Sequence, residues 1–186
     1  MTKFVHRVFH HTHGRQWAVF SQDERYRYML GVRWAPGPQV HFLLHNPSTG
    51  TELYLDATLR NCKAIAQHHG YGSMTIGNRL AGGRSSKPGD CDAMVDPVGE
   101  YTDVFLRSMW NKAATVVVGW GNCKLSTERA TQVLQHLREW QILHQQPLVC
   151  LGLTKRNEPK HPGAQGRHRI APTTPFQSYF LPTITT

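Results

Sequence analysis

The feature that most constrains this chain is an apolar run that ends abruptly in a polar turn. Residues 40–45 read as a short β-strand, and the turn Asn46-Pro47-Ser48-Thr49-Gly50 follows with an obligatory bend at Pro47. Asp56 then opens a helical pattern. In an open α/β sheet, a loop between a strand and a helix lies at the carboxyl end of the strand, where ligands bind. The stretch therefore predicts an α/β fold with a ligand site beside Asn46.

The same alternation of strand and helix continues through the middle of the chain. Short β-branched or apolar runs end in polar or glycine-rich turns, and amphipathic helical patterns separate them. Strands that alternate with helices form βαβ units, so we expect a short, mainly parallel central sheet. The further strands are expected at residues 73–76, 115–118 and 148–151, and the helices after Asp56, at residues 100–112 and after Ser126.

The two ends of the chain differ from this core. Residues 1–36 hold three short β-rich runs separated by turn residues, which predicts an antiparallel N-terminal β extension. Residues 156–186 are basic and rich in proline and glycine, which predicts a loop-rich C-terminal segment. A chain of 186 residues most simply forms one domain, so we expect a single domain with its α/β core at residues 37–155.

The charge of the chain favours a polyanionic partner. Lys and Arg number 21 against 12 Asp and Glu, which gives a formal net charge of +9. An excess of this size attracts nucleic acid, and DNA is the partner that we expect.

Cysteine usage and hydropathy bear on the compartment. The four cysteines form no C-x-x-C pair, so we expect reduced, intracellular thiols. No apolar run approaches the roughly 20 residues that span a bilayer, and the N-terminus lacks the features of a secretory signal. The histidines near the N-terminus have no neighbouring acid or cysteine to complete a metal site. We predict a cytoplasmic protein without metal, cofactor or membrane partner.

Four polar or aromatic residues follow predicted strands directly. They are Asn46, Asn78, Trp120 and Lys155. Because the carboxyl ends of parallel strands lie at one edge of a sheet, we expect these four side chains along a common rim. This rim is the predicted site.

These loops carry motifs that resemble a bacterial and phage family of proteins of unknown function. The resemblance runs in order from about residue 25 to about residue 165. One departure is Pro162-Gly163-Ala164, because the family tends to have a bulkier apolar residue after His-Pro. The motifs are Asn46-Pro47-Ser48-Thr49, Asp56 and Thr58 with Arg60 downstream, Gly70-Tyr71-Gly72, Asn78, Pro97-Val98-Gly99, Trp120-Gly121, Leu151-Gly152-x-Thr154-Lys155 and Pro159-Lys160-His161-Pro162.

A second, fainter resemblance implies more about function. The order of strand-ending Asn-Pro, Gly-Trp-Gly and late His-Pro is similar to the uracil-DNA glycosylase superfamily. That resemblance implies a three-layer α/β/α fold around a short parallel sheet. It also implies that Asn46 positions the attacking water and that His161 stabilises the leaving base. The leucine-bearing intercalation loop of the superfamily has no counterpart here, since Gly163-Ala164-Gln165-Gly166 offers no large wedge.

The chemistry of these residues leaves alternatives open. An Asn can orient a water but cannot accept its proton, so Asp56 is the candidate base. The structural alternative is that Asp56 only caps its helix and that Asn46 hydrogen-bonds its own turn. His161 could donate to a base oxygen or to a phosphate. Trp120 either stacks on a base or covers the end of the sheet.

The predicted site therefore has three sets of residues. The catalytic set is Asn46, Asp56 and His161. The substrate-binding set is Pro47, Ser48, Thr49, Thr58, Asn78, Trp120 and Gly121. The nucleic-acid-binding set is Arg84, Lys155, Arg156, Lys160, Arg167 and Arg169.

Three functions follow from this reading. The first is a DNA glycosylase-like hydrolase that flips a base, which could be a modified one, and breaks its N-glycosidic bond. The second is an enzyme that acts on free nucleotides or nucleosides at the same rim. The third is a nucleic-acid-binding module without catalysis, in which Asn46 and Asp56 are only structural.

Overall fold

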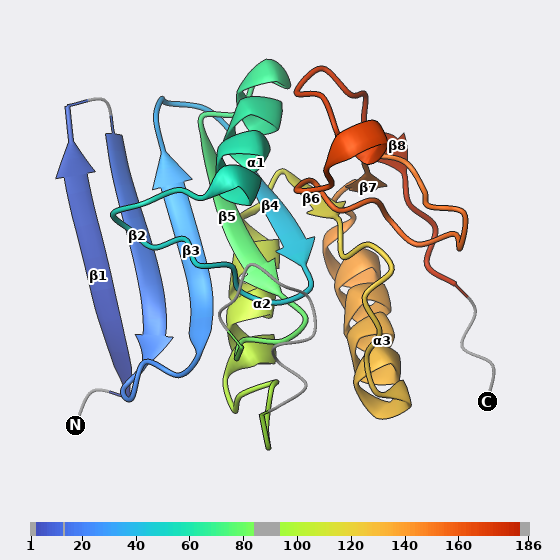
Figure 1. Cartoon of the computed structure of the whole chain (residues 1–186), viewed down its shortest axis with the longest axis horizontal. Coiled ribbons are helices and arrows are strands. Elements are labelled where there is room, and N and C mark those ends of the chain that lie inside the picture. The colour runs from blue at the N-terminus through green and yellow to red at the C-terminus, as the bar shows by residue number, and fades with distance from the viewer. Residues whose placement is uncertain (1–2, 13, 84–93, 183–186) are drawn as a thin grey trace.

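The strands and helices of the chain form a mixed α/β fold (Figure 1). The computed structural model describes residues 3–12, 14–83 and 94–182. The elements are β1 (Phe4–His11), β2 (Gly14–Ser21), β3 (Arg27–Arg33), β4 (Gln39–Leu44), α1 (Ala57–His68), β5 (Ser73–Asn78), α2 (Thr102–Lys112), β6 (Thr115–Val118), α3 (Thr127–His144), β7 (Leu148–Cys150) and β8 (Gln177–Ser178).

One eight-stranded sheet has the order β1-β2-β3-β5-β4-β6-β7-β8. Within the described residues, β4 pairs in parallel with β5 and β6, and β6 pairs in parallel with β7. The other four pairings, β1–β2, β2–β3, β3–β5 and β7–β8, are antiparallel. The α/β class is confirmed, but the sheet as a whole is mostly antiparallel. The predicted N-terminal strands and the short β8 extend it at its two edges.

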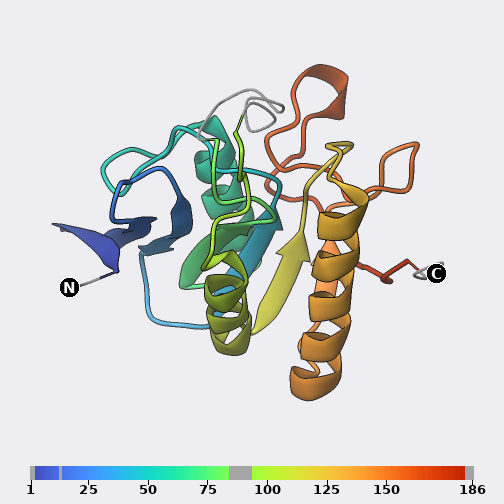
Figure 2. The ribbon, with the colours of Figure 1, turned by 90° about the horizontal axis from the view of Figure 1, so that it is seen from below.

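Each helix buries one face against the sheet. The buried residues of α1 (Leu59, Cys62, Ile65 and Ala66) fall on one face of the helix and join a core with β3, β4 and β5. The buried apolar residues of α2 and α3 form a second core with β6 and β7. Seen from below, α1 lies on one side of the strands, with α2 and α3 on the other (Figure 2).

Side-chain caps set the starts of two helices. Asp56 Oδ1 accepts a hydrogen bond from the Leu59 N–H over 2.9 Å, and Ser126 Oγ accepts one from the Arg129 N–H over 3.2 Å. Both caps satisfy backbone donors that a first helical turn leaves unpaired. The sequence predicted both starting points.

Strand register brings the predicted loops together. Leu44 pairs with Asn78, Leu43 with Val118, and Val118 with Cys150. The parallel strands β4, β5, β6 and β7 therefore end at one edge of the sheet. The loops after them start side by side, as expected.

Candidate functional site

A pocket of about 960 Å³ lies at these strand ends. Its walls come from the loop after β4, the start of α1, the ends of β5 and β6, and the segment around residues 153–168. Of the predicted site residues, those that line it are Asn46, Ser48, Thr49, Asp56, Thr58, Asn78, Trp120, Gly121, Lys155, Arg156, Lys160, His161 and Arg167.

Two of the predicted residues that the structure describes are not part of the pocket wall. Pro47 is buried in the turn, and Arg169 is exposed on the C-terminal segment. Neither side chain lines the cavity. Arg84 lies outside the described residues.

Asn46 makes one contact within its own turn, as its structural alternative predicted, and a second one to a residue far along the chain. Its amide nitrogen donates to the Gly83 carbonyl over 3.1 Å and to the Pro47 carbonyl over 3.4 Å. No described residue donates to its Oδ1. The side chain is therefore held in place by its nitrogen, while its oxygen remains an acceptor for a ligand or a water.

Asp56 joins the helix start to the turn. Besides the Leu59 N–H on Oδ1, its Oδ2 accepts a hydrogen bond from the Gly50 N–H over 3.2 Å. The predicted capping role is confirmed. Each carboxylate oxygen keeps a further lone pair, so these two bonds leave the carboxylate able to accept a proton.

Arg27 is a site residue that sequence reasoning missed. It is only 2% exposed on β3, and its Nη1 donates to the Ser48 carbonyl over 3.1 Å and to the Gly50 carbonyl. Arg27 alternates along the strand with the apolar residues Tyr28, Leu30 and Val32, a pattern that by itself indicates the opposite face of the sheet. The guanidinium instead fixes the turn that carries Asn46, and it lines the pocket.

His161 is held in one tautomer. The Gly163 N–H donates to its Nδ1 over 3.0 Å, so a neutral ring carries its proton on Nε2. Burial lowers the pKa of His161 to about 4, while the nearby charge of Asp56 acts in the opposite direction. At neutral pH the ring is an uncharged hydrogen-bond donor.

Gly163 explains the departure from the family pattern after His-Pro. A Cβ at this position would lie 2.3 Å from Thr58 Oγ1 and 3.1 Å from His161 Nδ1. The backbone here passes directly between the start of α1 and the histidine ring. A larger residue would push these two site residues apart.

His45 also lines the pocket and was not predicted. It is 4% exposed, and its Nδ1 lies 3.0 Å from Arg79 Nη2. Burial, together with the charges of Arg79 and His161, lowers the pKa of His45 to about 4. An apolar strand position gave no signal for this role, because a buried histidine in a strand is usually a core residue.

Trp120 is mainly a packing residue. It is 3% exposed, the Arg79 guanidinium lies 4.6 Å from its ring centroid, and its Nε1 donates to Glu158 Oε2 over 2.7 Å. Tyr179 meets the ring edge-on. Of the two alternatives for Trp120, these contacts favour covering the end of the sheet.

Asn78 presents an unsatisfied acceptor. The residue is 4% exposed, lines the pocket, and its Oδ1 has no hydrogen-bond partner among the described residues. A buried polar atom without a partner costs free energy unless a ligand or water completes it. Asn78 thus leaves an unpaired acceptor at the pocket wall.

The chain's family follows from a comparison with family models. The model described as Protein of unknown function (DUF1643) matches residues 27–163. The chain belongs to the DUF1643 family. This confirms the first resemblance, and the match extends from Arg27 in the pocket wall to Gly163 beside His161. No curated protein and no solved structure matches the chain. The resemblance to the uracil-DNA glycosylase superfamily has no counterpart in these results and stays a prediction.

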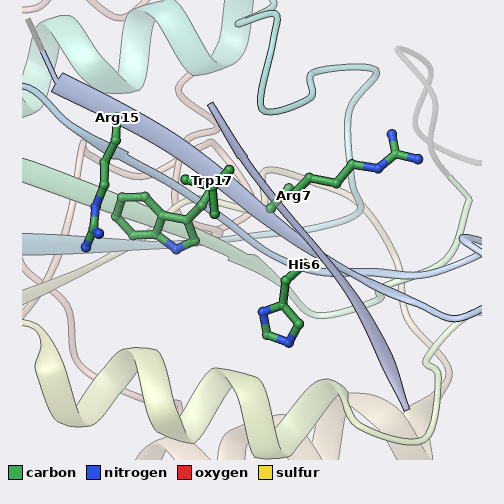
Figure 3. A pocket seen from close by; sticks show the side chains of 6 residues that line it. His6, Arg7, Arg15 and Trp17 are labelled. Carbon is green, nitrogen blue, oxygen red and sulfur yellow. The ribbon is translucent and has the colours of Figure 1, made fainter. Parts of the chain in front are cut away.

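A second, smaller pocket lies before the DUF1643 match, on β1 and β2. It measures about 190 Å³ and is lined by His6, Arg7, Arg15 and Trp17 with two small apolar neighbours. Figure 3 shows Arg15 and Trp17 close together, with His6 nearby and Arg7 pointing another way. The Arg15 guanidinium lies 5.1 Å from the centroid of the Trp17 ring. None of the predicted site residues lines this pocket.

Two further properties concern the described part of the DUF1643 chain. It holds no group of three His, Cys, Asp or Glu side chains that could bind a metal ion. None of its helices has the length and apolar character needed to cross a bilayer.

Proposed function

We propose that this chain is a glycosylase-type hydrolase that breaks the N-glycosidic bond of a base flipped out of DNA. One observation carries the proposal. Asn46 and His161, which are far apart in sequence, line the same pocket beside a set of cationic side chains. The first offers an acceptor for water, and the second offers a neutral donor for a leaving base.

The geometry suits the demands of this reaction. The bond between the sugar and the base breaks with its electron pair on the base, and the sugar becomes electron-poor. A donor fixed in advance stabilises the departing anion without reorganising at the moment of reaction. His161 has that form, because the Gly163 N–H keeps the ring proton on Nε2.

Asp56 is the proposed base for the attacking water. Asn46 orients the water through Oδ1 but cannot take its proton. The carboxylate of Asp56 is fixed by Gly50 and Leu59 and lines the same pocket. The single residue thus anchors the turn and accepts the proton that the water loses.

The proposed DNA partner rests on charge. Lys155, Arg156, Lys160 and Arg167 line the pocket along its C-terminal wall, while Asp56 is the acidic residue among its lining residues. Phosphate contacts from such side chains position a strand, and an extrahelical base then enters the cavity. Modified bases are the proposed substrates, since weakened pairing lowers the cost of extrusion.

The proposed framework is a three-layer α/β/α arrangement around a parallel central sheet, as in the uracil-DNA glycosylase superfamily. The consecutive parallel pairings of β5, β4, β6 and β7 support it. The two cores, one with α1 and one with α2 and α3, support it as well. The antiparallel strands on both sides are then additions to that framework.

The test is release of bases from DNA. Single- and double-stranded oligonucleotides that carry a range of modified bases are incubated with the full chain, and alkaline treatment then cuts any abasic sites. We expect one substrate class to be cut, and an Asn46→Ala variant to lose the activity. Asn111→Ala is the matched control, because Asn111 is exposed at the end of α2 and does not line the pocket.

Other outcomes would reject the proposal. If no DNA yields abasic sites while free nucleosides or nucleotides are hydrolysed, the pocket serves small substrates. If DNA binds with unchanged affinity to the wild type and to Asn46→Ala, and neither releases a base, the chain is a binding module.

A further inference from the structure

His45 has no part in the proposed reaction as described so far. It is the last residue before Asn46, it is nearly fully buried, and its ring lines the pocket. His41, four residues earlier on β4, is also buried but does not line the pocket. His41 is therefore a core residue, whereas His45 faces the space that a ligand would occupy.

The position of the ring proton on His45 follows from its partner. A guanidinium has only N–H donors, so Nδ1 of His45 must be the acceptor in its contact with Arg79 Nη2. A neutral ring then carries its proton on Nε2. Within the described residues, no side chain or carbonyl bonds to this Nε2.

Arg79 is well placed to impose this state. It is 7% exposed, its Nη2 also donates to the Cys123 carbonyl over 2.9 Å, and its guanidinium stacks on Trp120. The charge of the guanidinium disfavours protonation of His45. The cation therefore both orients the imidazole and keeps it neutral.

His45 and His161 thus share one arrangement. Each is neutral, each has its Nδ1 occupied by an N–H donor, and each is left with an Nε2–H in the same pocket. The charge that His161 would carry lowers the pKa of His45, so the two rings lie within electrostatic range. Two neutral donors can converge on one oxygen, whereas two imidazolium rings would repel each other.

We propose that His45 is a second catalytic donor, whose Nε2–H binds the leaving base together with that of His161. This inference rests on the proposed function. As the glycosidic bond breaks, its electron pair passes to the base, and the two N–H groups bind the oxygen where the negative charge accumulates. Water forms the new bond to the sugar carbon and transfers its proton to Asp56.

Two substitutions at His45 distinguish the role of its Nδ1 from the role of its Nε2. Asn at this position can keep an acceptor for Arg79 but does not reach as far as Nε2, whereas Gln can place an N–H near the Nε2 position. We expect His45→Asn to lower the single-turnover rate of base release by about 10²-fold, the effect of removing one such donor. His45→Gln should retain more of the rate, and DNA affinity should change little in both. His41→Asn is the matched control and should keep the wild-type rate.

A second measurement does not depend on activity. Long-range ¹H–¹⁵N spectra of the ¹⁵N-histidine-labelled full chain at pH 7 show which nitrogen of each ring is protonated, and the His45→Asn variant assigns the His45 signals. We expect His45 and His161 to be neutral with the proton on Nε2. A proton on Nδ1 of His45, or a charged His45 ring, would overturn the inference.

The outcomes also separate this inference from the proposed function. If DNA is cut at the same rate by the wild type and His45→Asn, the glycosylase proposal survives and the role of His45 is rejected. If the wild type cuts no DNA, the glycosylase proposal is rejected. The spectra then decide whether His45 has the donor form that the structure assigns to it.

Discussion

The backbone N–H of Gly163 donates to Nδ1 of His161 over 3.0 Å, and the same glycine leaves no space for a side chain beside Thr58. The glycine therefore packs the C-terminal segment against the start of α1. It sets the direction of the His161 ring and the form in which the ring enters the pocket.

Gly163→Ala should therefore reduce activity. The new Cβ would meet Thr58 Oγ1 at 2.3 Å, so Thr58 or the His161 loop must move. A displacement of about 1 Å in a site of this kind can cost about 10²-fold in rate. Single-turnover base release measures the loss. The double variant Thr58→Ala/Gly163→Ala removes the closest clash, and it should recover part of the free energy of unfolding that Gly163→Ala loses. A Gly163→Ala variant with wild-type rate would show that the loop tolerates the shift.

Asp56 offers a test of its two roles. Asp56→Ser keeps a capping oxygen for Leu59 but loses the carboxylate, so it should cost less than the roughly 1 kcal/mol typical of Asp56→Ala at a cap. Its activity should nevertheless fall steeply, because the proposed base is gone. The matched control is Ser126→Ala, which removes the equivalent cap of α3 away from the pocket. Urea unfolding and base release, measured on the same samples, compare the two effects. Full activity in Asp56→Ser would leave Asp56 with a structural role only.

Arg27 should control the order of the turn that carries Asn46. In Arg27→Met the buried stem is kept, while the hydrogen bonds to the Ser48 and Gly50 carbonyls are lost. Hydrogen bonds to a charged group contribute about 1.5–3 kcal/mol each, so stability and activity should both fall. Hydrogen exchange of the amides of residues 48–54 should speed up more than that of β4. Arg27→Lys keeps the charge but lacks the planar fork, and it should recover little of the loss. Unchanged exchange rates in Arg27→Met would contradict this prediction.

The buried histidines predict how stability depends on pH. The pKa values of His41, His45 and His161 are lowered to about 4 in the folded chain, mainly by burial. An unfolded histidine titrates near 6.5. Between about pH 6.5 and pH 4 the unfolded chain therefore binds more protons, and the free energy of unfolding falls as the pH is lowered. Above this range the three rings are neutral in both states and add no pH dependence. Urea midpoints measured from pH 4.5 to 8 should show this shape. Replacement of His41 by Asn should reduce the acid slope by roughly one proton, and an unchanged slope would contradict the assignment.

Salt dependence tests the cationic wall of the pocket. If Lys155 or Arg156 contacts a phosphate, its replacement by Ala should make the slope of log affinity against log salt shallower by about 0.7–0.9. Fluorescence anisotropy with a labelled oligonucleotide measures the slope. Arg107→Ala is the matched control, because this exposed arginine on α2 does not line the pocket. The same reduction in the control and in the pocket variants would mean that the whole surface, rather than this wall, attracts DNA.

Local patterns in the sequence predicted the position of the site. The apolar run before Asn46, the cap at Asp56 and the β-branched run before Trp120 each specify where a strand or helix ends. Short strands of this kind, alternating with helices, place their carboxyl ends at one edge. The family match over residues 27–163 is likewise a property of the sequence.

Local sequence patterns did not predict the long-range contacts. Neither the antiparallel pairing of β3 with β5 nor the addition of β8 beside β7 follows from local periodicity, because a strand's partner depends on the whole sheet. Sequence patterns did not identify the buried polar residues of the site, for a related reason. The alternation on β3 does not reveal that Arg27 reaches two carbonyls of a distant turn.

The sequence by itself therefore determined the strand ends, the two helix caps, the excess of positive charge and the family. Each depends on neighbouring residues or on simple composition. Only the tertiary structure decided that Arg79 holds His45, that Gly163 holds His161 and that both rings line one pocket. The Arg79–His45 contact and the shared pocket join segments far apart in the chain. The Gly163–His161 contact is local, but the fold of its loop decides whether it forms. The proton on each imidazole is set by the partner that folding brings to it.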